Sequence, residues 1–153
     1  MRNKQKGFSL IELLIVVAII LIIAAIAIPN LLRSKMAANE ASAVGSLRTL
    51  NTACVAFSTT YSQFPNVLGD LGPSNGATPT STMSDLIDSV LASGSKTGYT
   101  FSFSAGAGNQ SYSITASPIT VGTTGQRYFY TDQSGVIRNS TTGAADSSST
   151  PIS

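Results

Sequence analysis

The 153-residue sequence contains no histidine, no tryptophan and a single cysteine, Cys54. Without histidine there is no Ser-His-Asp triad and no histidine-bound metal. One cysteine forms neither an internal disulfide nor a four-thiolate zinc site, so Cys54 is predicted to be a small buried residue. Asp85 and Asp88, three positions apart, are predicted to be a solvated pair on one helix face rather than a catalytic acid and base. We expect a protein that is not an enzyme and that holds no metal or cofactor.

Charged side chains are also scarce, at 10% of the chain, and Ser, Thr, Gly and Asn supply its polarity. Three of the nine basic residues lie in the first six positions, so the rest of the chain carries six basic and seven acidic side chains. No basic surface remains, and nucleic acid is not expected as the main partner. An uncharged polar surface is compatible with close packing against copies of the same chain.

Apolar residues, by contrast, are concentrated near the amino end. From Phe8 to Ile28 the chain is apolar almost without interruption, apart from Ser9 and Glu12. At about 1.5 Å of rise per residue this stretch forms a helix of roughly 30 Å, enough to cross the hydrocarbon core of a bilayer. A carboxylate inside such a segment costs about 2.5 to 3.5 kcal/mol on insertion scales, so Glu12 requires a partner.

Three other interpretations of this stretch are open. Ala25-Ile26-Ala27 resembles the cleavage site of a secretory signal peptide, but the run exceeds the usual length of about 7 to 15 residues and contains a charge. A plain membrane anchor explains the length, but not the order Gly-Phe-Ser-Leu-Ile-Glu after three basic residues. A buried core helix would be unusual with so long an unbroken apolar run.

The stretch KGFSLIELL at positions 6–14, followed by the apolar run and Pro29-Asn30, resembles the prepilin signature of type IV pilins and their pseudopilin relatives. The resemblance implies that a membrane peptidase cleaves between Gly7 and Phe8 and methylates the new amino group of Phe8. The family's glutamate, which serves in assembly, corresponds to Glu12, and its helix-perturbing proline corresponds to Pro29. Many pilins close a C-terminal loop with a disulfide, and in this respect the sequence departs from the family.

These features imply a structural subunit of a type IV pilus filament that polymerises through its N-terminal helix. Glu12 would then pair with the amino group of Phe8, in its own chain or in a neighbouring subunit, because an isolated charge in an apolar core is expensive. Two alternatives come from other classes. One is a pseudopilin of a type II secretion system, and the other is a membrane-anchored periplasmic module that does not polymerise.

The resemblance also implies partners and a location. The partners are copies of the same chain, the inner membrane before assembly, a prepilin peptidase and a pilus assembly platform. Arg2, Lys4 and Lys6 precede the apolar run, so the positive-inside tendency leaves the amino end in the cytoplasm and the globular part in the periplasm. After assembly the subunit would lie in an extracellular pilus.

Helical periodicity continues beyond the apolar run. Apolar residues three or four positions apart form one stripe, namely Ala43, Leu47, Leu50, Cys54, Phe57 and Tyr61. One helix is therefore predicted from Phe8 to about Ser62, with a kink or a locally unwound segment at Pro29. The stripe is predicted to pack against a sheet.

The rest of the chain is predicted to form a loop, a short helix and several strands. Thr82 or Ser84 is predicted to cap a helix with Asp85 in its first turn and a stop at Gly94. Alternating residues predict strands at 99–103 and 112–116, and a hairpin in which 127–131 pairs with 136–138 across a plain turn at 132–135.

The predicted fold is α+β, a long N-terminal helix with a transmembrane first half, packed on a small antiparallel sheet of about four strands. The predicted segments are a cleaved leader (1–7), a transmembrane and filament-core helix (8–29), its amphipathic continuation (30–62), a connecting loop with a short helix (63–98), the sheet (99–138) and a tail rich in Ser, Thr, Gly and Ala (139–153).

Overall fold

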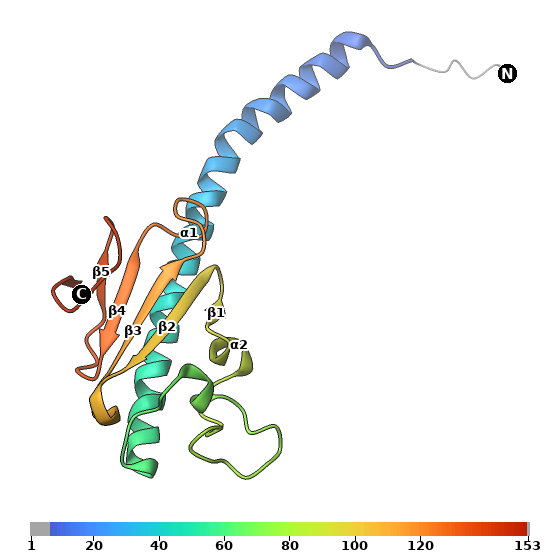
Figure 1. Ribbon diagram of the computed structural model, residues 1–153. Coiled ribbons are helices and arrows are strands. Elements are labelled where there is room, and N and C mark those ends of the chain that lie inside the picture. Colours follow the sequence, from blue (N-terminus) through green and yellow to red (C-terminus); the bar gives the residue numbers. More distant parts are fainter. Residues whose placement is uncertain (1–6, 153) are drawn as a thin grey trace. The chain divides into compact units, whose positions relative to one another are not determined.

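The computed structural model describes residues 7–152, and the basic residues Arg2, Lys4 and Lys6 of the predicted leader lie outside this range. The chain divides into two compact units between Lys35 and Met36, and each is described by itself. Helix α1, Leu10–Tyr61, contributes residues to both units (Figure 1). The first unit is the beginning of this helix, and the second combines the rest of α1 with the sheet.

Helix α1 has almost the bounds that its periodicity predicts. It ends where Ser62 adopts a left-handed φ of 58°, and Phe64 and Pro65 follow. Two alternatives were expected at Pro29, a kink or a locally unwound segment. Pro29 lies inside α1 and the residues on both sides of it are helical, so the chain is not unwound there. A bend at Pro29 stays a prediction.

The sheet has six strands rather than about four, all antiparallel and ordered as they occur in the chain. The strands are β1 Ser95–Lys96, β2 Tyr99–Ala105, β3 Tyr112–Pro118, β4 Tyr128–Asp132, β5 Arg138–Ser140 and β6 Thr150–Pro151. The two additional strands, β1 and β6, have two residues each. A segment of two residues carries no alternation, which is why the period alone did not reveal these edges.

The predicted hairpin is present with a longer connection. Strand β4 pairs with β5 through Tyr130 opposite Arg138, so β5 begins at Arg138 and not at Val136. Ile137 instead turns toward the core, where it is 8% exposed. The Ser134 N–H donates to Asp132 Oδ1 at 2.9 Å, and Gly135 has a φ of 74°, so this segment forms a turn.

The prediction for the short helix was wrong at its start. Helix α2 covers only Ser89–Ala92, and its N-cap is Asp88, whose Oδ1 accepts from the Leu91 N–H at 2.8 Å. Asp85 has a φ of 59°, which is not helical, so Asp85 and Asp88 do not share a helix face. Asp88 also pairs with Lys96 at 2.9 Å. Gly94, with a φ of 79°, follows the helix end as predicted.

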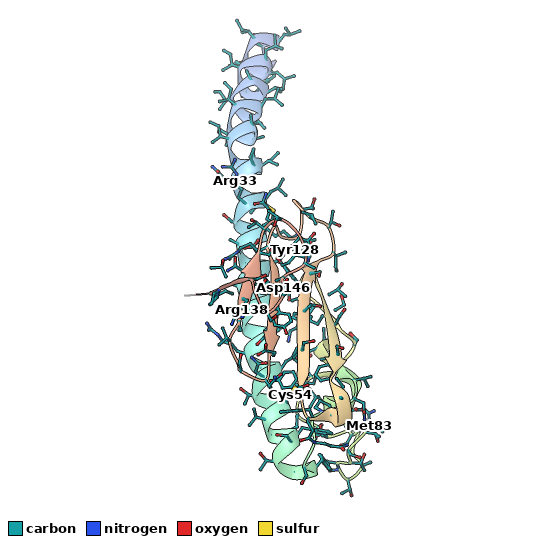
Figure 2. All side chains as sticks on the ribbon, turned by 60° about the vertical axis from the view of Figure 1, so that its left-hand side comes forward. Arg33, Cys54, Met83, Tyr128, Arg138 and Asp146 are labelled. Atoms are coloured by element: carbon teal, nitrogen blue, oxygen red, sulfur yellow. The ribbon has the colours of Figure 1, made fainter. Side chains whose placement is uncertain are left out.

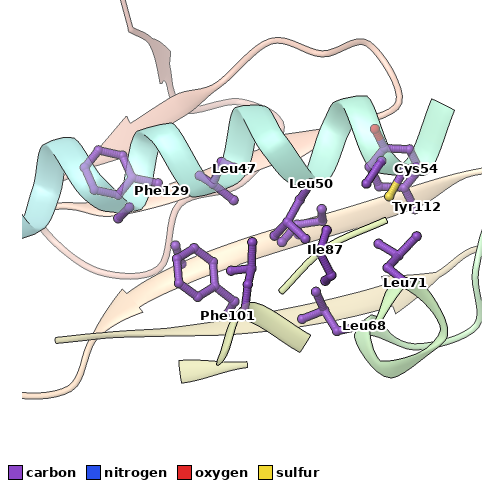
Figure 3. Packing of buried hydrophobic residues seen from close by; sticks show 14 of the residues in the cluster. Leu47, Leu50, Cys54, Leu68, Leu71, Ile87, Phe101, Tyr112 and Phe129 are labelled. Carbon is purple, nitrogen blue, oxygen red and sulfur yellow. The ribbon is translucent and has the colours of Figure 1, made fainter. Parts of the chain in front are cut away.

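The stripe of α1 forms one side of the hydrophobic core in the second unit. Leu47, Leu50 and Cys54 are fully covered and face side chains of the sheet (Figure 3). Burial raises the pKa of the Cys54 thiol to about 12. The loop after α1 is more than a connection, because its short 3-10 helix, Leu68–Leu71, places Leu68 and Leu71 in the same core.

Polar contacts also join α1 to the sheet, and the strongest involve Glu40, which is 8% exposed. Its Oε1 accepts from the backbone N–H groups of Gln126 at 2.9 Å and Arg127 at 3.2 Å, and its Oε2 accepts from Arg127 Nε at 2.7 Å. Burial raises the pKa of Glu40, but these hydrogen bonds outweigh it and hold the pKa below its ordinary value. The charged carboxylate therefore fastens the chain before β4 onto the helix.

Glu40→Gln should destabilise the folded chain by about 2 kcal/mol, because hydrogen bonds to charged groups contribute about 1.5 to 3 kcal/mol. The lowered pKa means that the wild-type stabilisation is complete above the pKa of an unfolded Glu and is lost as pH falls through the folded pKa. Denaturant unfolding in detergent at several pH values should show a smaller acid dependence in the variant.

Asp88→Asn is the matched control, because asparagine keeps the α2 cap and loses only the exposed pair with Lys96. Its effect should stay below about 1 kcal/mol. Equal stability losses in the two variants would contradict the role assigned to Glu40.

Candidate functional site

The first part of α1 presents apolar side chains on all sides. Every large apolar residue from Phe8 to Leu32 is exposed, with Phe8 at 78% and Ile26 at 65%. Figure 2 shows these side chains standing out all around the helix. An amphipathic surface helix would have one polar face, so this segment has the pattern of a helix buried in lipid or among other helices.

Length and composition agree with this pattern. Helix α1 contains an 18-residue window with a mean hydropathy of 3.3, and no part of that window is buried within the chain. It is the one helix among residues 7–152 that is long and apolar enough to cross a membrane. Soluble monomers rarely expose a continuous apolar surface of this size, so the segment requires a lipid or protein environment.

Glu12 is placed at the start of this helix by a capping arrangement. The Ser9 N–H donates to Glu12 Oε2 at 2.9 Å, and the Leu13 N–H donates to the Ser9 carbonyl oxygen at 3.2 Å. Ser9 stands at the N-cap position and Glu12 at N3, as in the carboxylate half of a capping box. The negative charge also lies at the positive end of the helix dipole. Glu12 thus has a partner in its own chain.

The predicted site residues gather at this end. Gly7 and Phe8 directly precede the cap, and no heavy atom lies within 4 Å of the place where a Cβ on Gly7 would stand. Phe8 lies two residues before the first residue of α1, and Glu12 is the third residue of that helix. Pro29 lies 17 positions beyond Glu12 and belongs to the same helix but not to this cluster.

Ser9 is the functional residue that the sequence reasoning missed. The signal was available, because Ser-x-x-Glu before an apolar run is the sequence mark of a capping box. Within residues 7–152 no three His, Cys, Asp or Glu side chains gather to hold a metal ion. This end of helix α1 therefore offers one carboxylate, that of Glu12, surrounded by apolar side chains.

Comparison with known proteins gives a family match at the amino end and several similar proteins. Residues 2–28 match the family described as the prokaryotic N-terminal methylation motif. The type IV major pilin protein PilA of Myxococcus xanthus is 45% identical over 69 residues, which are 43% of this chain and 31% of that protein. The type IV wide pilus major component PilA4 of Thermus thermophilus is 65% identical over 40 residues, 26% of this chain and 30% of that protein.

A secretion protein is also similar. The type II secretion system core protein G of Dickeya chrysanthemi is 29% identical over 72 residues, 47% of each chain. No solved structure matches the chain.

The apolar helix, its capped glutamate and the matched motif define a class, the proteins with an N-terminal prepilin methylation signal. Within that class, the chain is similar over part of its length to type IV major pilins and, at lower identity, to a secretion core protein. The matched segments span less than half the length of these relatives.

Glu12→Ala should loosen the first turn of α1, whereas Glu12→Gln should keep it, because an amide oxygen also accepts from the Ser9 N–H. Loss of a capping contact of about 1 kcal/mol corresponds to roughly fivefold faster exchange of the Ser9 amide proton. NMR exchange measurements in detergent micelles test this, and equal rates in the two variants would contradict the capping role.

Proposed function

We propose that this protein is the structural subunit of a type IV pilus filament. The observation that carries the proposal is the exposure of every large apolar side chain in the first part of α1, a surface interrupted by one carboxylate. Before assembly, lipid of the inner membrane covers this surface. In the filament, copies of the same helix replace the lipid and become an apolar core.

Glu12 sets the register of assembly in this proposal. A prepilin peptidase cleaves between Gly7 and Phe8, and methylation of Phe8 leaves a charged amino group. The Ser9 N–H donates to Oε2 of Glu12, and no other side-chain bond to Glu12 is formed among residues 7–152, so Oε1 would accept from an amino group of the same or a neighbouring chain. Leaving either charge unpaired in the apolar core would be costly, which favours subunits whose stagger brings the two together. Pro29 remains the proposed point at which α1 bends.

The location follows from the same proposal. The amino end lies in the cytoplasm and the second unit in the periplasm until an assembly platform adds the subunit to an extracellular pilus. The similarity of the Dickeya secretion protein supports a second candidate, a type II secretion pseudopilin confined to the periplasm. Fibres sheared from the cell surface and made mainly of this chain would decide for the pilus.

Processing can be tested at the predicted junction. The mature chain should begin with N-methyl-Phe8, and Gly7→Leu should block cleavage almost completely. Among the described residues, apart from its chain neighbours, no heavy atom lies within 4 Å of a Cβ placed on Gly7, so the expected loss of cleavage reports on the peptidase. Mass spectrometry of membrane fractions measures both results.

Gly45→Leu is the matched control, since Gly45 also lies in open space, and this variant should be processed normally. A wild-type chain that begins at Ile28 or retains Met1 would contradict the cleavage assignment, as would normal processing of Gly7→Leu.

Assembly can be tested with the same two substitutions of Glu12. Glu12→Ala and Glu12→Gln should both insert into the membrane, yet both should lower fibre yield by about tenfold or more, because neither pairs with the Phe8 cation and each 1.4 kcal/mol of lost interaction is a factor of ten. Electron microscopy of sheared fibres and immunoblots of membranes provide the measurements.

The pair of variants separates charge from capping. Normal yield from Glu12→Gln with loss in Glu12→Ala would assign the effect to the helix cap, and normal yield from both would remove the register role. An anchored module that never polymerises predicts no fibres from the wild-type chain at all.

A further inference from the structure

Exposed apolar side chains occur in the connection between β3 and β4 as well as in the first part of α1. We call residues 119–125 the apolar turn. It contains no charged residue, and its two large side chains, Ile119 and Val121, are 58% and 57% exposed. Two neighbouring aliphatic side chains on an uncharged loop have no role in the hydrophobic core described above.

The apolar turn is held in one conformation. The backbone N–H groups of Thr123 and Thr124 donate to the Thr120 carbonyl oxygen at 3.1 and 2.9 Å, and the Gly122 N–H donates to the Gly125 carbonyl oxygen at 2.9 Å. Asn39 Nδ2 of α1 donates to the Thr124 carbonyl oxygen at 2.8 Å. Among residues 7–152, the carbonyl oxygens of Val121, Gly122 and Thr123 accept no hydrogen bond from the turn or from α1. Because the turn is already ordered, binding a partner through Ile119 and Val121 costs less conformational entropy.

A mainly apolar hollow lies elsewhere on the same unit. We call it the flank groove, a hollow of about 370 Å³ beside α1, and its lining residues are Arg48, Thr49, Thr52, Ala53, Ala56 and Leu86. Leu86 is 38% exposed at its edge. Arg48 is exposed, and the two ion pairs formed among residues 7–152, Lys96–Asp88 and Arg127–Glu40, do not include it.

We infer that in the filament the apolar turn of one subunit inserts into the flank groove of a neighbouring subunit. Ile119 and Val121 would cover the apolar wall formed by Ala53, Ala56 and Leu86. The Arg48 guanidinium would donate hydrogen bonds to the carbonyl oxygens at the tip of the turn. This inference rests on the proposed filament function and adds a second contact to the one made by the N-terminal helices.

The positions of the two surfaces favour a second copy as the occupant. The apolar turn is bonded to α1 at Asn39, whereas the groove lies along Arg48 to Ala56. The apolar turn therefore does not fill the groove of its own chain. The centre of the groove is some 12 residues from Asn39, or about 18 Å along the helix. A contact between two different surfaces of identical chains does not close a dimer and, repeated with an axial stagger, builds an open fibre.

Cysteine pairs test the contact in assembled fibres. Val121→Cys combined with Leu86→Cys should give a ladder of dimers and higher multimers after treatment of sheared fibres with a short bis-maleimide. Cys54 can stay in place, because it is fully buried and its raised pKa keeps the thiol protonated. The control pair is Val121→Cys with Ser102→Cys, which is exposed on the sheet and outside the groove, and it should give no ladder.

The outcomes distinguish this inference from the proposed function. Fibres with a ladder only in the Leu86 pair support the contact, whereas fibres without a ladder, or with equal ladders in both pairs, overturn it and leave the filament function intact. If the double variants form no fibres, the single variant Val121→Cys decides. Its thiol should react at least about tenfold more slowly with maleimide in fibres than in detergent-dispersed subunits, and equal rates overturn the contact. A wild-type chain without fibres would remove both proposals.

Discussion

The apolar surface around the first part of α1 is the constraint on which the rest of the protein depends. No other part of the described chain covers these side chains. Their exposure to water would be unfavourable, so the segment needs lipid or other protein around it. Lipid tails are as apolar as leucine, so lipid provides no hydrophobic drive for such helices to associate. In the proposed filament, association of these helices would depend on packing and on polar groups, of which the carboxylate of Glu12 is the charged one between Phe8 and Ile28.

The two parts of α1 have different surfaces: the first is exposed on all sides, and the second packs against the sheet on one side. The first part is apolar all round, whereas the second has a single stripe that includes Leu47, Leu50 and Cys54 and packs against the sheet. Two carboxylates mark the difference. Glu40 is paired by Gln126 and Arg127, whereas among residues 7–152 Glu12 accepts one side-chain bond, from the Ser9 N–H to its Oε2. In the proposed filament, the second oxygen of Glu12 would accept from the amino group of Phe8.

Some of this structure could be predicted from residue patterns, and some could not, for local reasons. The stripe of α1 repeats over five turns, and its predicted residues are buried apart from Tyr61, which is partly exposed. Ser46 and Ala53, which the stripe did not include, are buried as well. The start of α2 was ambiguous because Thr82, Ser84, Asp85 and Asp88 are all residues that favour the first turn of a helix. Only the positive φ of Asp85 and the bond from Leu91 to Asp88 decide between them. Ser9 was missed although its spacing to Glu12 indicated a cap.

The order of residues alone determined the apolar helix, the position of its single acid and the α+β plan, because these follow from period and composition within a few turns of chain. Tertiary structure decided the edges of the sheet, since β1 and β6 exist only through their neighbours. It also decided the partner of Glu40, since Arg127 lies 87 residues away in the chain. A contact over such a separation depends on how the whole sheet is placed against the helix, and no local pattern contains that information.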